Sequence, residues 1–237
     1  MQHYFGRVSS QGVSLSEADI HHLTDVRRAE IGEKIEISDG DRTFLCCVEK
    51  LRPLSIKVLN ELSKRDLPAK VILCFGLLKN EHSELLIQKC TELGVSEFRP
   101  FTSDRTIIKP KEKEDSKLIR MRKIAESAAK QSRRESLPLV KEYTSFKELS
   151  DEVEGITFFA YEEEKWSNSL WNALNGLDKD FNGTIRLFIG PEGGFSPKEV
   201  EIAKEKGWKF VSLGKRILRA ETAGIYMSSV ISSYLER

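Results

Sequence analysis

The first quarter of the chain alternates hydrophobic and polar residues over short runs, which is the pattern of half-buried β-strands. Such runs cover residues 3–8, 34–38, 42–48 and 55–61. Asp39-Gly40, between two of these runs, predicts a hairpin because glycine readily adopts the positive φ of a tight turn. A helix is predicted at residues 16–27, capped by Ser14 or Ser16. Short strands of this kind are expected to close into a small β-barrel, which leaves few exposed edges.

The pattern changes after a polar stretch at residues 63–68, which predicts a linker. Short apolar runs now alternate with longer segments in which apolar residues recur every three to four positions. The runs predict buried strands at 71–75, 97–101, 156–161, 185–189 and 210–213. The segments predict helices at 84–93, 117–133 and 222–235. This alternation is typical of a parallel sheet with helices on both faces. We therefore expect two domains, residues 1–66 and 67–237.

Two glycine-rich turns follow the last two predicted strands. The first occupies residues 189–195 (IGPEGGF) and the second residues 213–223 (LGKRILRAETA). Ligands of parallel sheets bind outside the carboxyl ends of the strands. We therefore expect the two turns to wall one pocket, which is the candidate functional site.

The first turn has a specific backbone chemistry. Gly190, Gly193 and Gly194 have no Cβ and tolerate positive φ, so they allow a ligand to approach backbone groups closely. Residues 196–199 (SPKE) then read as a capping box with proline at the first helical position. A helix is predicted to start there and to end near Gly207.

The glycine pattern separates this chain from other nucleotide-binding classes. The first turn does not continue into the Gly-Lys-Ser/Thr of a phosphate loop, and it lacks the glycine spacing of the dinucleotide fingerprint. A Rossmann-type methyltransferase would carry its glycine-rich turn after the first strand, where residues 76–80 contain only Gly76. The order of the turns along the chain therefore favours a different α/β class.

Composition narrows the class of protein and the cellular compartment that we expect. The chain is 39% hydrophobic and 32% charged, and no apolar stretch approaches the roughly 20 residues of a membrane span. Residues 1–6 lack the basic start and apolar core of a secretory signal. The four cysteines, Cys46, Cys47, Cys74 and Cys90, show no Cys-x-x-Cys spacing. We therefore expect a cytoplasmic protein with no membrane partner, no disulfide framework and no metal.

The net charge of +1 conceals a local excess of positive charge. Residues 109–134 contain ten Lys and Arg against four Asp and Glu. Such a basic block attracts phosphates through counterion release. On composition alone, a solvated helix face with (i, i+4) ion pairs remains the alternative.

Together the two turns resemble the motifs of a known family, the bacterial 16S ribosomal RNA uracil-N3 methyltransferases (RsmE-like) of the SPOUT superfamily. Residues 89–95 (KCTELGV), 128–138 and 22–40 resemble the same family, so the resemblance spans nearly the whole chain. Single positions that match are Pro100, Arg105, Gln131, Ser132, Arg134 and Pro138. Arg27 departs from the pattern, because the family usually has an apolar residue there.

The resemblance implies an α/β fold: a PUA-like β-barrel at residues 1–66 that holds RNA, and a SPOUT domain at residues 67–237 with a C-terminal trefoil knot. It also implies a homodimer with the last helix at the interface. That helix carries an apolar stripe of Met227, Val230, Ile231 and Tyr234, which core packing within one chain explains equally.

The resemblance also implies S-adenosylmethionine as the cofactor and S-adenosylhomocysteine as its product. The apolar side chains of the second turn suit an adenine slot, and the loop at residues 160–162 would add a further wall. The expected cofactor contacts are Ala160, Tyr161, Gly190, Glu192, Gly193, Leu213, Gly214, Ile217, Leu218, Arg219, Thr222 and Ala223.

The implied reaction requires that uracil N3 be activated as a nucleophile. Uracil N3 carries a proton that has to leave, which calls for a general base or for stabilisation of the resulting anion. Glu221 and Glu192 are the candidate catalytic carboxylates, and Arg219 would neutralise the anion or grip a phosphate. Glu221 is equally a helix-start residue favoured by the macrodipole. Proton loss to water, without any base, also remains open.

The resemblance implies RNA contacts in both domains. A base inside a structured ribosomal helix must be splayed out before it is modified. Phosphate contacts would supply affinity and register. Candidates in segments that match the family are Lys79, Asn80, Arg105, Gln131 and Arg134. Candidate phosphate contacts in the barrel are Arg7, Arg27, Arg28 and Arg42.

The function expected from these features is methylation of N3 of a uridine in 16S ribosomal RNA of the 30S subunit. One alternative is a SPOUT enzyme acting on another RNA, such as tRNA. Another is a non-catalytic RNA-binding factor in ribosome assembly. The sequence does not distinguish naked RNA from the assembled subunit as the substrate.

Overall fold

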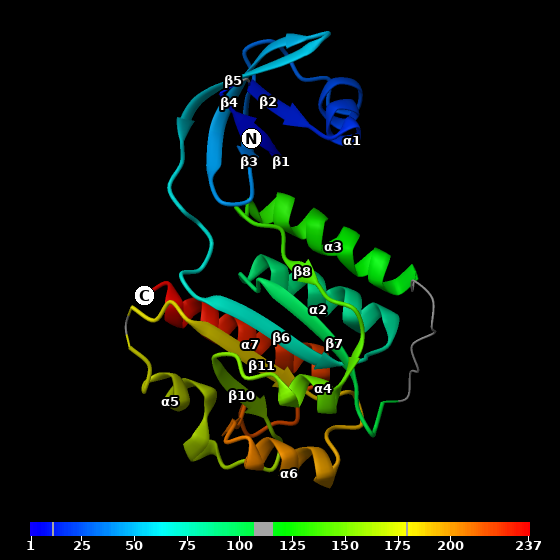
Figure 1. Cartoon of the computed structure of the whole chain (residues 1–237), viewed down its shortest axis with the longest axis vertical. Helices are drawn as coiled ribbons and strands as arrows, with labels where there is room; N and C mark the ends of the chain where they lie inside the picture. Colours follow the sequence, from blue (N-terminus) through cyan, green and yellow to red (C-terminus); the bar gives the residue numbers. More distant parts are fainter. Residues whose placement is uncertain (11, 107–115, 179) are drawn as a thin grey trace. The chain divides into compact units, whose positions relative to one another are not determined.

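The computed structural model describes residues 1–10, 12–106, 116–178 and 180–237. The chain forms two compact units (Figure 1). The first unit comprises Met1–Asp66 and Ala129–Leu137, and the second comprises Leu67–Ala128 and Pro138–Arg237. The single boundary expected from the sequence did not include the return of residues 129–137 to the first unit.

The first unit is built on a five-stranded sheet in the order β2-β1-β3-β4-β5. Neighbouring strands are antiparallel except β1 and β3. Because β2 and β5 contact each other, the sheet nearly closes on itself. The predicted small barrel is therefore confirmed, with β2 as a strand that the sequence pattern did not predict. The strands are β1 (His3–Ser9), β2 (Gly12–Leu15), β3 (Lys34–Ser38), β4 (Thr43–Leu51) and β5 (Leu54–Glu61).

Local sequence signals explain the hairpin between β3 and β4. Gly40 has φ +105°, which an L side chain rarely adopts. The Asp39 carboxylate accepts a hydrogen bond from the backbone N–H of Arg42 at 2.9 Å. The Asp39-Gly40 signal therefore correctly predicted a turn.

The predicted helix at residues 16–27 is present in two parts. α1 (Glu17–His21) begins after Ser16, whose side chain accepts a hydrogen bond from the N–H of Asp19 at 3.1 Å. A π-helical turn, η1 (His22–Val26), continues it. Ser16, rather than Ser14, is therefore the capping residue.

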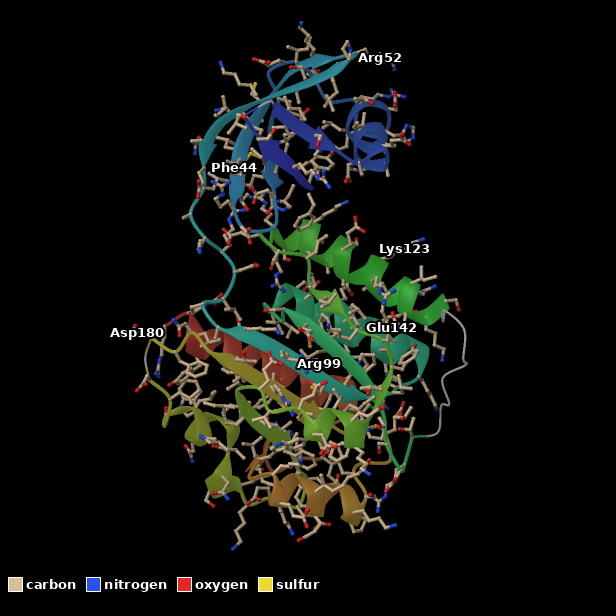
Figure 2. The ribbon with its side chains drawn as sticks, viewed as in Figure 1. Phe44, Arg52, Arg99, Lys123, Glu142 and Asp180 are labelled. Atoms are coloured by element: carbon tan, nitrogen blue, oxygen red, sulfur yellow. The ribbon has the colours of Figure 1, made fainter. Side chains whose placement is uncertain are left out.

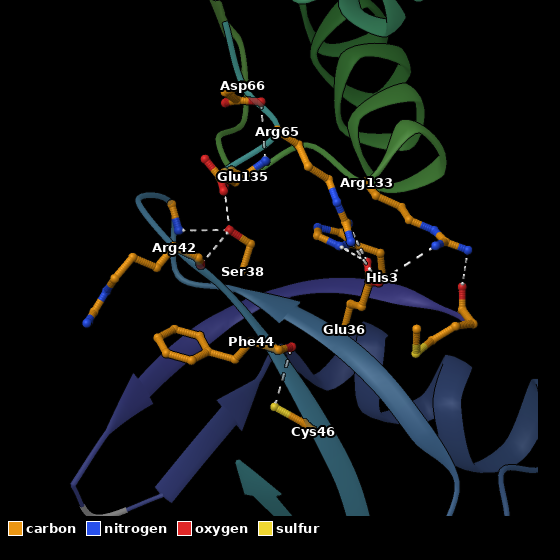
Figure 3. Close-up of polar contacts among 12 residues, drawn as sticks. His3, Glu36, Ser38, Arg42, Phe44, Cys46, Arg65, Asp66, Arg133 and Glu135 are labelled. Atoms are coloured by element: carbon orange, nitrogen blue, oxygen red, sulfur yellow. Dashed lines mark hydrogen bonds and ion pairs between the residues drawn. The ribbon is translucent and has the colours of Figure 1, made fainter. Parts of the chain in front are cut away.

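Charged side chains hold residues 129–137 to the rest of the first unit (Figure 3). Arg133 Nη1 lies 3.6 Å from Oε1 of Glu36, whose side chain is almost fully buried. Arg134 donates from Nε to the Asp66 carboxylate at 3.1 Å. These ion pairs link positions far apart in sequence, so no local pattern indicated them.

The second unit contains a seven-stranded sheet in which every pair of neighbours is parallel. The order is β12-β10-β11-β6-β7-β8, and β9 also pairs with β7. This confirms the predicted parallel α/β architecture. The strands are β6 (Lys70–Gly76), β7 (Glu97–Thr102), β8 (Leu139–Val140), β9 (Thr144–Ser145), β10 (Ile156–Ala160), β11 (Thr184–Ile189) and β12 (Lys209–Val211).

Both faces of this sheet are buried, which explains why its strands read as continuous apolar runs. In β6, Val71, Leu73 and Phe75 pack into one core, whereas Ile72 and Cys74 pack into the other. All five side chains are at most 1% exposed.

Helices cover the two faces (Figure 1). The first core is packed by α2 (Asn80–Glu92), α5 (Leu170–Leu174), α7 (Ala220–Leu235) and the first part of α3 (Ser116–Ser132). The second core is packed by α4 (Phe146–Asp151) and α6 (Pro197–Glu205). A short 3₁₀ helix, η2 (Trp166–Asn168), precedes α5.

Two buried arginines are held by hydrogen bonds inside the second unit. Arg99 of β7 (Figure 2) donates to Glu97 at 2.6 Å and to Glu154 at 3.0 Å. Arg186 of β11 is 1% exposed, and its Nη1 donates to the Glu152 carbonyl at 2.7 Å. These cations stabilise the sheet and its connections, and they are not available to a ligand.

The apolar stripe of the last helix packs against the core of its own chain. Met227, Ile231 and Tyr234 are at most 1% exposed and belong to the first core. Core packing is therefore confirmed for these three residues of the predicted stripe, and Val230 is half-buried against the same core. Among the described residues, no helix combines the length and apolar character that a membrane crossing requires.

Candidate active site

A pocket of about 910 Å³ opens beside three adjacent strands of the parallel sheet, β12, β10 and β11. Its walls come from the segments that follow these strands, within residues 160–163, 189–195 and 212–219. The two glycine-rich turns therefore meet, as the sequence predicted. A pocket of this size suits a small organic ligand such as a nucleoside.

Close backbone packing shapes the turn after β11. A Cβ on Gly190 would lie 3.2 Å from the backbone carbon of Gly194, whose own φ is +67°. A Cβ on Gly76, at the end of β6, would lie 2.4 Å from the backbone nitrogen of Pro191. Glycine is therefore required where the ends of β6 and β11 touch.

The start of α6 fixes a neighbouring loop to the pocket. Ser196 and Glu199 form the predicted capping box. Ser196 also donates to the Asp104 carboxylate at 2.6 Å, and the Asp104 N–H donates to Glu199 at 3.1 Å. Arg105, the next residue, donates from Nη1 to the Gly193 carbonyl at 3.2 Å. The capping box therefore both starts a helix and positions a pocket arginine.

The second turn supplies apolar side chains. β12 ends at Val211, earlier than predicted, so Leu213 belongs to the turn. Gly214 has φ +129°, which permits the chain reversal. Leu213 and Leu218 are half-buried, Ile217 is 84% exposed, and all three line the pocket. This partly open apolar wall suits a flat aromatic ring.

α7 begins directly after this turn. Arg219 is its N-cap residue and is exposed at the pocket. Glu221 lies in the first turn of the helix, also lines the pocket, and has a side chain only 9% exposed. Its Oε1 lies 3.2 Å from Nδ1 of His82 on α2. The helix start and the pocket wall therefore coincide at Glu221.

Glu192, the other candidate carboxylate, lies in a more exposed environment than Glu221. It is exposed on the turn after β11, and its Oε1 accepts a hydrogen bond from the backbone N–H of Lys79 at 3.1 Å. Lys79 is the N-cap residue of α2 and has no side-chain cap of its own. Glu192 therefore connects the first glycine turn to the start of α2.

Charges of both signs line the pocket. Tyr161 donates a hydrogen bond to Glu163 at 2.8 Å, and this bond raises the pKa of the phenol. Within the described residues, no group of three or more His, Cys, Asp or Glu side chains is arranged to hold a metal. The lining cations are Lys79, Arg105, Lys204, Lys215, Arg216 and Arg219. The lining carboxylates are Glu162, Glu163, Glu192, Glu201 and Glu221.

Most predicted cofactor contacts lie on this pocket. Gly193 and Thr222 are not among its lining residues. Gly193 instead provides the carbonyl that holds Arg105, and Thr222 is exposed on α7. The predicted residues that do line it are Ala160, Tyr161, Gly190, Glu192, Leu213, Gly214, Ile217, Leu218, Arg219 and Ala223.

The predicted RNA contacts are divided between the units. Lys79 and Arg105 line the pocket. Arg7, Arg28 and Gln131 are exposed in the first unit. Asn80 is the first residue of α2, and its side chain lies outside the described part of the structure.

Three arginines of the first unit are engaged within it. Arg134 is 5% exposed and bonded to Asp66, so we withdraw it from the candidate RNA contacts. Arg27 pairs with Glu33 at 2.7 Å, and Arg42 lies 3.3 Å from a carboxylate oxygen of Asp39. The two latter pairs are partly exposed, so these arginines remain accessible to a phosphate.

Much of the basic block is neutralised by ion pairs. Arg120 of α3 donates to Glu84 of α2 at 2.8 Å, and Arg122 pairs with Glu142. Lys130 lies 2.8 Å from Asp19. These partners are distant in sequence, so (i, i+4) ion pairs do not explain these three cations. Positions 109, 111 and 113 of the block lie outside the described residues.

Sequence reasoning missed several pocket residues: His82, Glu163, Lys204, Lys215 and Arg216. Lys215 and Arg216 lie within the second glycine turn, so their position along the chain was a usable signal. His82 gave no signal, because only the packing of α2 against α7 brings it to Glu221.

A parallel α/β sheet with a pocket at its carboxyl edge and a separate small β-unit defines a ligand-binding α/β protein with an accessory domain. Comparison with known proteins identifies the family to which the chain belongs. The family model of an RNA methyltransferase domain matches residues 65–232, and that of an RNA methyltransferase PUA domain matches residues 15–59. The chain belongs to the ribosomal RNA small subunit methyltransferase E family.

Individual relatives resemble the chain along its whole length. Ribosomal RNA small subunit methyltransferase E of Bacillus subtilis is 34% identical, over 100% of this chain and 98% of the relative. The same enzyme of Neisseria gonorrhoeae, in a crystal structure bound to S-adenosyl methionine, has 25% identity and a TM-score of 0.82, covering 98% and 97% of the two chains. A crystal structure of a hypothetical protein has 32% identity and a TM-score of 0.88, covering 99% of both chains.

Proposed function

We propose that this protein transfers a methyl group from S-adenosylmethionine to N3 of a uridine in 16S ribosomal RNA of the small subunit, in the cytoplasm. The observation that carries the proposal is the convergence of the two glycine-rich turns on one pocket, in a chain of the methyltransferase E family. The relative from Neisseria gonorrhoeae, whose crystal structure contains S-adenosyl methionine, supports the choice of cofactor.

The residues of the pocket fit such a cofactor. Leu213, Ile217 and Leu218 would flank adenine, and the glycine-rich turn at Gly190 would bring backbone groups against the ligand. The mixture of cations and carboxylates suits the charged amino-acid part of the cofactor. When bound, S-adenosylmethionine supplies an electrophilic methyl group and leaves as S-adenosylhomocysteine.

Glu221 is the carboxylate that we assign to the uracil N3 proton. It lines the pocket while its side chain is 9% exposed, so it sits where water is largely excluded. Glu192 is the weaker candidate, because it is exposed and already accepts the N–H of Lys79. In this assignment Glu221 takes the N3 proton, which makes N3 nucleophilic.

Arg219 would stabilise the negative charge that develops on the uracil oxygens. It is exposed at the pocket, two residues before Glu221, and its guanidinium is permanently charged. Lys79 and Arg105 also line the pocket and would contact phosphates that flank the splayed uridine.

The first unit would bind a part of the RNA other than the reacting uridine. Its match to an RNA methyltransferase PUA domain supports this role, and its exposed Arg7, Arg28 and Gln131 are the proposed contacts. We further propose a homodimer through the second unit. Tyr226 of α7, which is 38% exposed, is a candidate interface residue, since the buried stripe of the helix is already occupied by its own core.

Methyl transfer to defined RNAs tests the proposal. The purified protein would be incubated with radiolabelled S-adenosylmethionine and 30S subunits, free 16S RNA or bulk tRNA, and the labelled nucleoside would be identified. We expect N3-methyluridine in 30S subunits or 16S RNA. Label in tRNA alone would indicate another RNA substrate, and tight RNA binding without transfer would indicate an assembly factor.

A further inference from the structure

His82 is the pocket residue that sequence patterns did not indicate. It lies near the start of α2, and its Nδ1 is 3.2 Å from Oε1 of Glu221 on α7. Both residues line the pocket, and the exposed fractions of their side chains are 23% and 9%. The imidazole therefore faces a carboxylate that is almost removed from solvent.

The packing of two helices fixes this distance. α2 and α7 contact each other directly, and both belong to the first core. One turn beyond the pair, a Cβ on Gly224 would lie 2.5 Å from Cδ1 of Leu86. Because Gly224 has no side chain, α7 approaches α2 closely enough for the imidazole to reach Glu221.

Few other groups compete for this carboxylate. Within the described part of the chain, His82 is the single basic side chain that lies within ion-pair distance of Glu221. On the other side of the ring, Nε2 lies 3.8 Å from Oε1 of Glu81, a side chain that is 84% exposed. His82 is therefore the basic side chain placed to orient the Glu221 carboxylate.

We propose that His82 is a positioning residue, which donates from Nδ1 to Glu221 and holds its carboxylate toward the pocket. The inference rests on the proposed function, in which Glu221 receives the N3 proton of uracil. Such contacts are often loosely aligned before the substrate binds and tighten in the reactive complex. His82 itself need not touch the RNA or the cofactor.

A set of four variants tests this role. His82→Leu removes the donor, whereas His82→Asn places an amide nitrogen where Nδ1 was. We expect His82→Leu to lower kcat about tenfold, with the cofactor Kd and the KM for RNA unchanged, and His82→Asn to recover activity to within about threefold of the parent. Glu221→Gln should lose about a hundredfold or more. The double variant His82→Leu/Glu221→Gln should be no slower than Glu221→Gln alone, since His82 acts through Glu221.

Readouts other than turnover complete the test. Calorimetry gives the cofactor Kd of each variant, and thermal unfolding shows that each one folds. The ¹⁵N resonances of the His82 ring, assigned by comparison with His82→Asn, should shift in Glu221→Gln. Glu81→Gln, which removes the exposed carboxylate on the other side of the ring, is the matched control and should leave kcat unchanged.

The outcomes separate the two proposals. Full activity of His82→Leu together with an inactive Glu221→Gln would overturn the role of His82 and leave that of Glu221 intact. If the losses of kcat in the two single variants multiplied in the double variant, the role of His82 would also be overturned. Full activity of Glu221→Gln would remove the base assignment and the role of His82 with it, while methyl transfer to 16S RNA would still stand.

Discussion

Glu192, on the turn after β11, accepts a hydrogen bond at 3.1 Å from the backbone N–H of Lys79, 113 positions earlier in the chain. A helix begins with N–H groups that have no intrahelical partner. Glu192 satisfies one of them at the start of α2, the helix that carries His82. A single side chain therefore connects the first glycine turn to the element that faces Glu221.

The first prediction concerns this connection. Glu192→Ala should fray the start of α2 and cost about 1 kcal/mol of stability, the usual effect of losing a helix cap. The amides of His82 and Ser83, which both bond to the Lys79 carbonyl, should exchange faster with deuterium. Glu192→Gln keeps an acceptor oxygen and serves as the control. Unchanged exchange in Glu192→Ala would contradict the structural role.

The second prediction concerns the contact between β6 and the first glycine turn. Gly76→Ala places a Cβ 2.4 Å from the backbone nitrogen of Pro191, so one of the two backbones has to move. We expect a loss of about 1 to 3 kcal/mol in stability and weaker cofactor binding, measured by thermal unfolding and calorimetry. Gly176→Ala, whose nearest neighbour would be 3.8 Å away, is the matched substitution and should be neutral. Equal behaviour of the two variants would refute the argument.

The third prediction is a pH dependence in the first unit. Burial raises the pKa of Asp66, but the charge of Arg134 and hydrogen bonds from Ser136 outweigh it, so the pKa of Asp66 lies below its ordinary value. A carboxylate with a lowered folded pKa stabilises the protein above its unfolded value of about 3.9, and this stabilisation is lost as pH falls through the folded value.

Asp66→Asn should therefore cost about 2 to 3 kcal/mol at pH 7, because a neutral amide replaces the carboxylate that pairs with the buried Arg134 guanidinium. The difference from the parent protein should shrink as the pH is lowered from 5 to 3. Thermal unfolding over this range measures it. Asp41→Asn removes an exposed carboxylate from the same unit and should show little effect at any pH. If the stability difference between Asp66→Asn and the parent protein stayed constant down to pH 3, this would contradict a lowered pKa of Asp66.

The fourth prediction concerns the cysteines. Burial raises the pKa of Cys46 to about 11 and the pKa values of Cys74 and Cys90 to about 12. The thiolate is the reactive form, so these three thiols should be inert in the native protein at pH 8. Cys47, on the same strand as Cys46 but half-buried, should react first with Ellman's reagent. Four thiols should react in denaturant, and native labelling of Cys74 or Cys90 would be inconsistent with this core.

Local patterns predicted much of this protein because the physics behind them is local. The capping box at Ser196 is satisfied within four residues, and Gly40 turns a hairpin through its own backbone. The strands of the parallel sheet were recognisable because both of their faces are buried, as the alternation along β6 shows. The glycine turns pointed to the pocket because ligands bind at the carboxyl ends of such strands.

Ion pairs between distant residues were not predictable in this way. Arg134 reads as a surface cation in a basic block, yet it is buried against Asp66, and Arg120 is committed to Glu84. Charge alone carries no information about which partner a side chain will meet. The trefoil knot stays a prediction from the family resemblance.

The sequence by itself determined the two-part organisation, the parallel sheet and the two turns that form the pocket, because hydrophobic period, capping residues and glycine act over a few positions. Tertiary structure alone decided that residues 129–137 pack with the first unit, that Glu192 binds the start of α2, and that His82 meets Glu221. Each of these depends on elements far apart in the chain being packed together, and the pairing of side chains across such contacts is fixed only once the cores have formed.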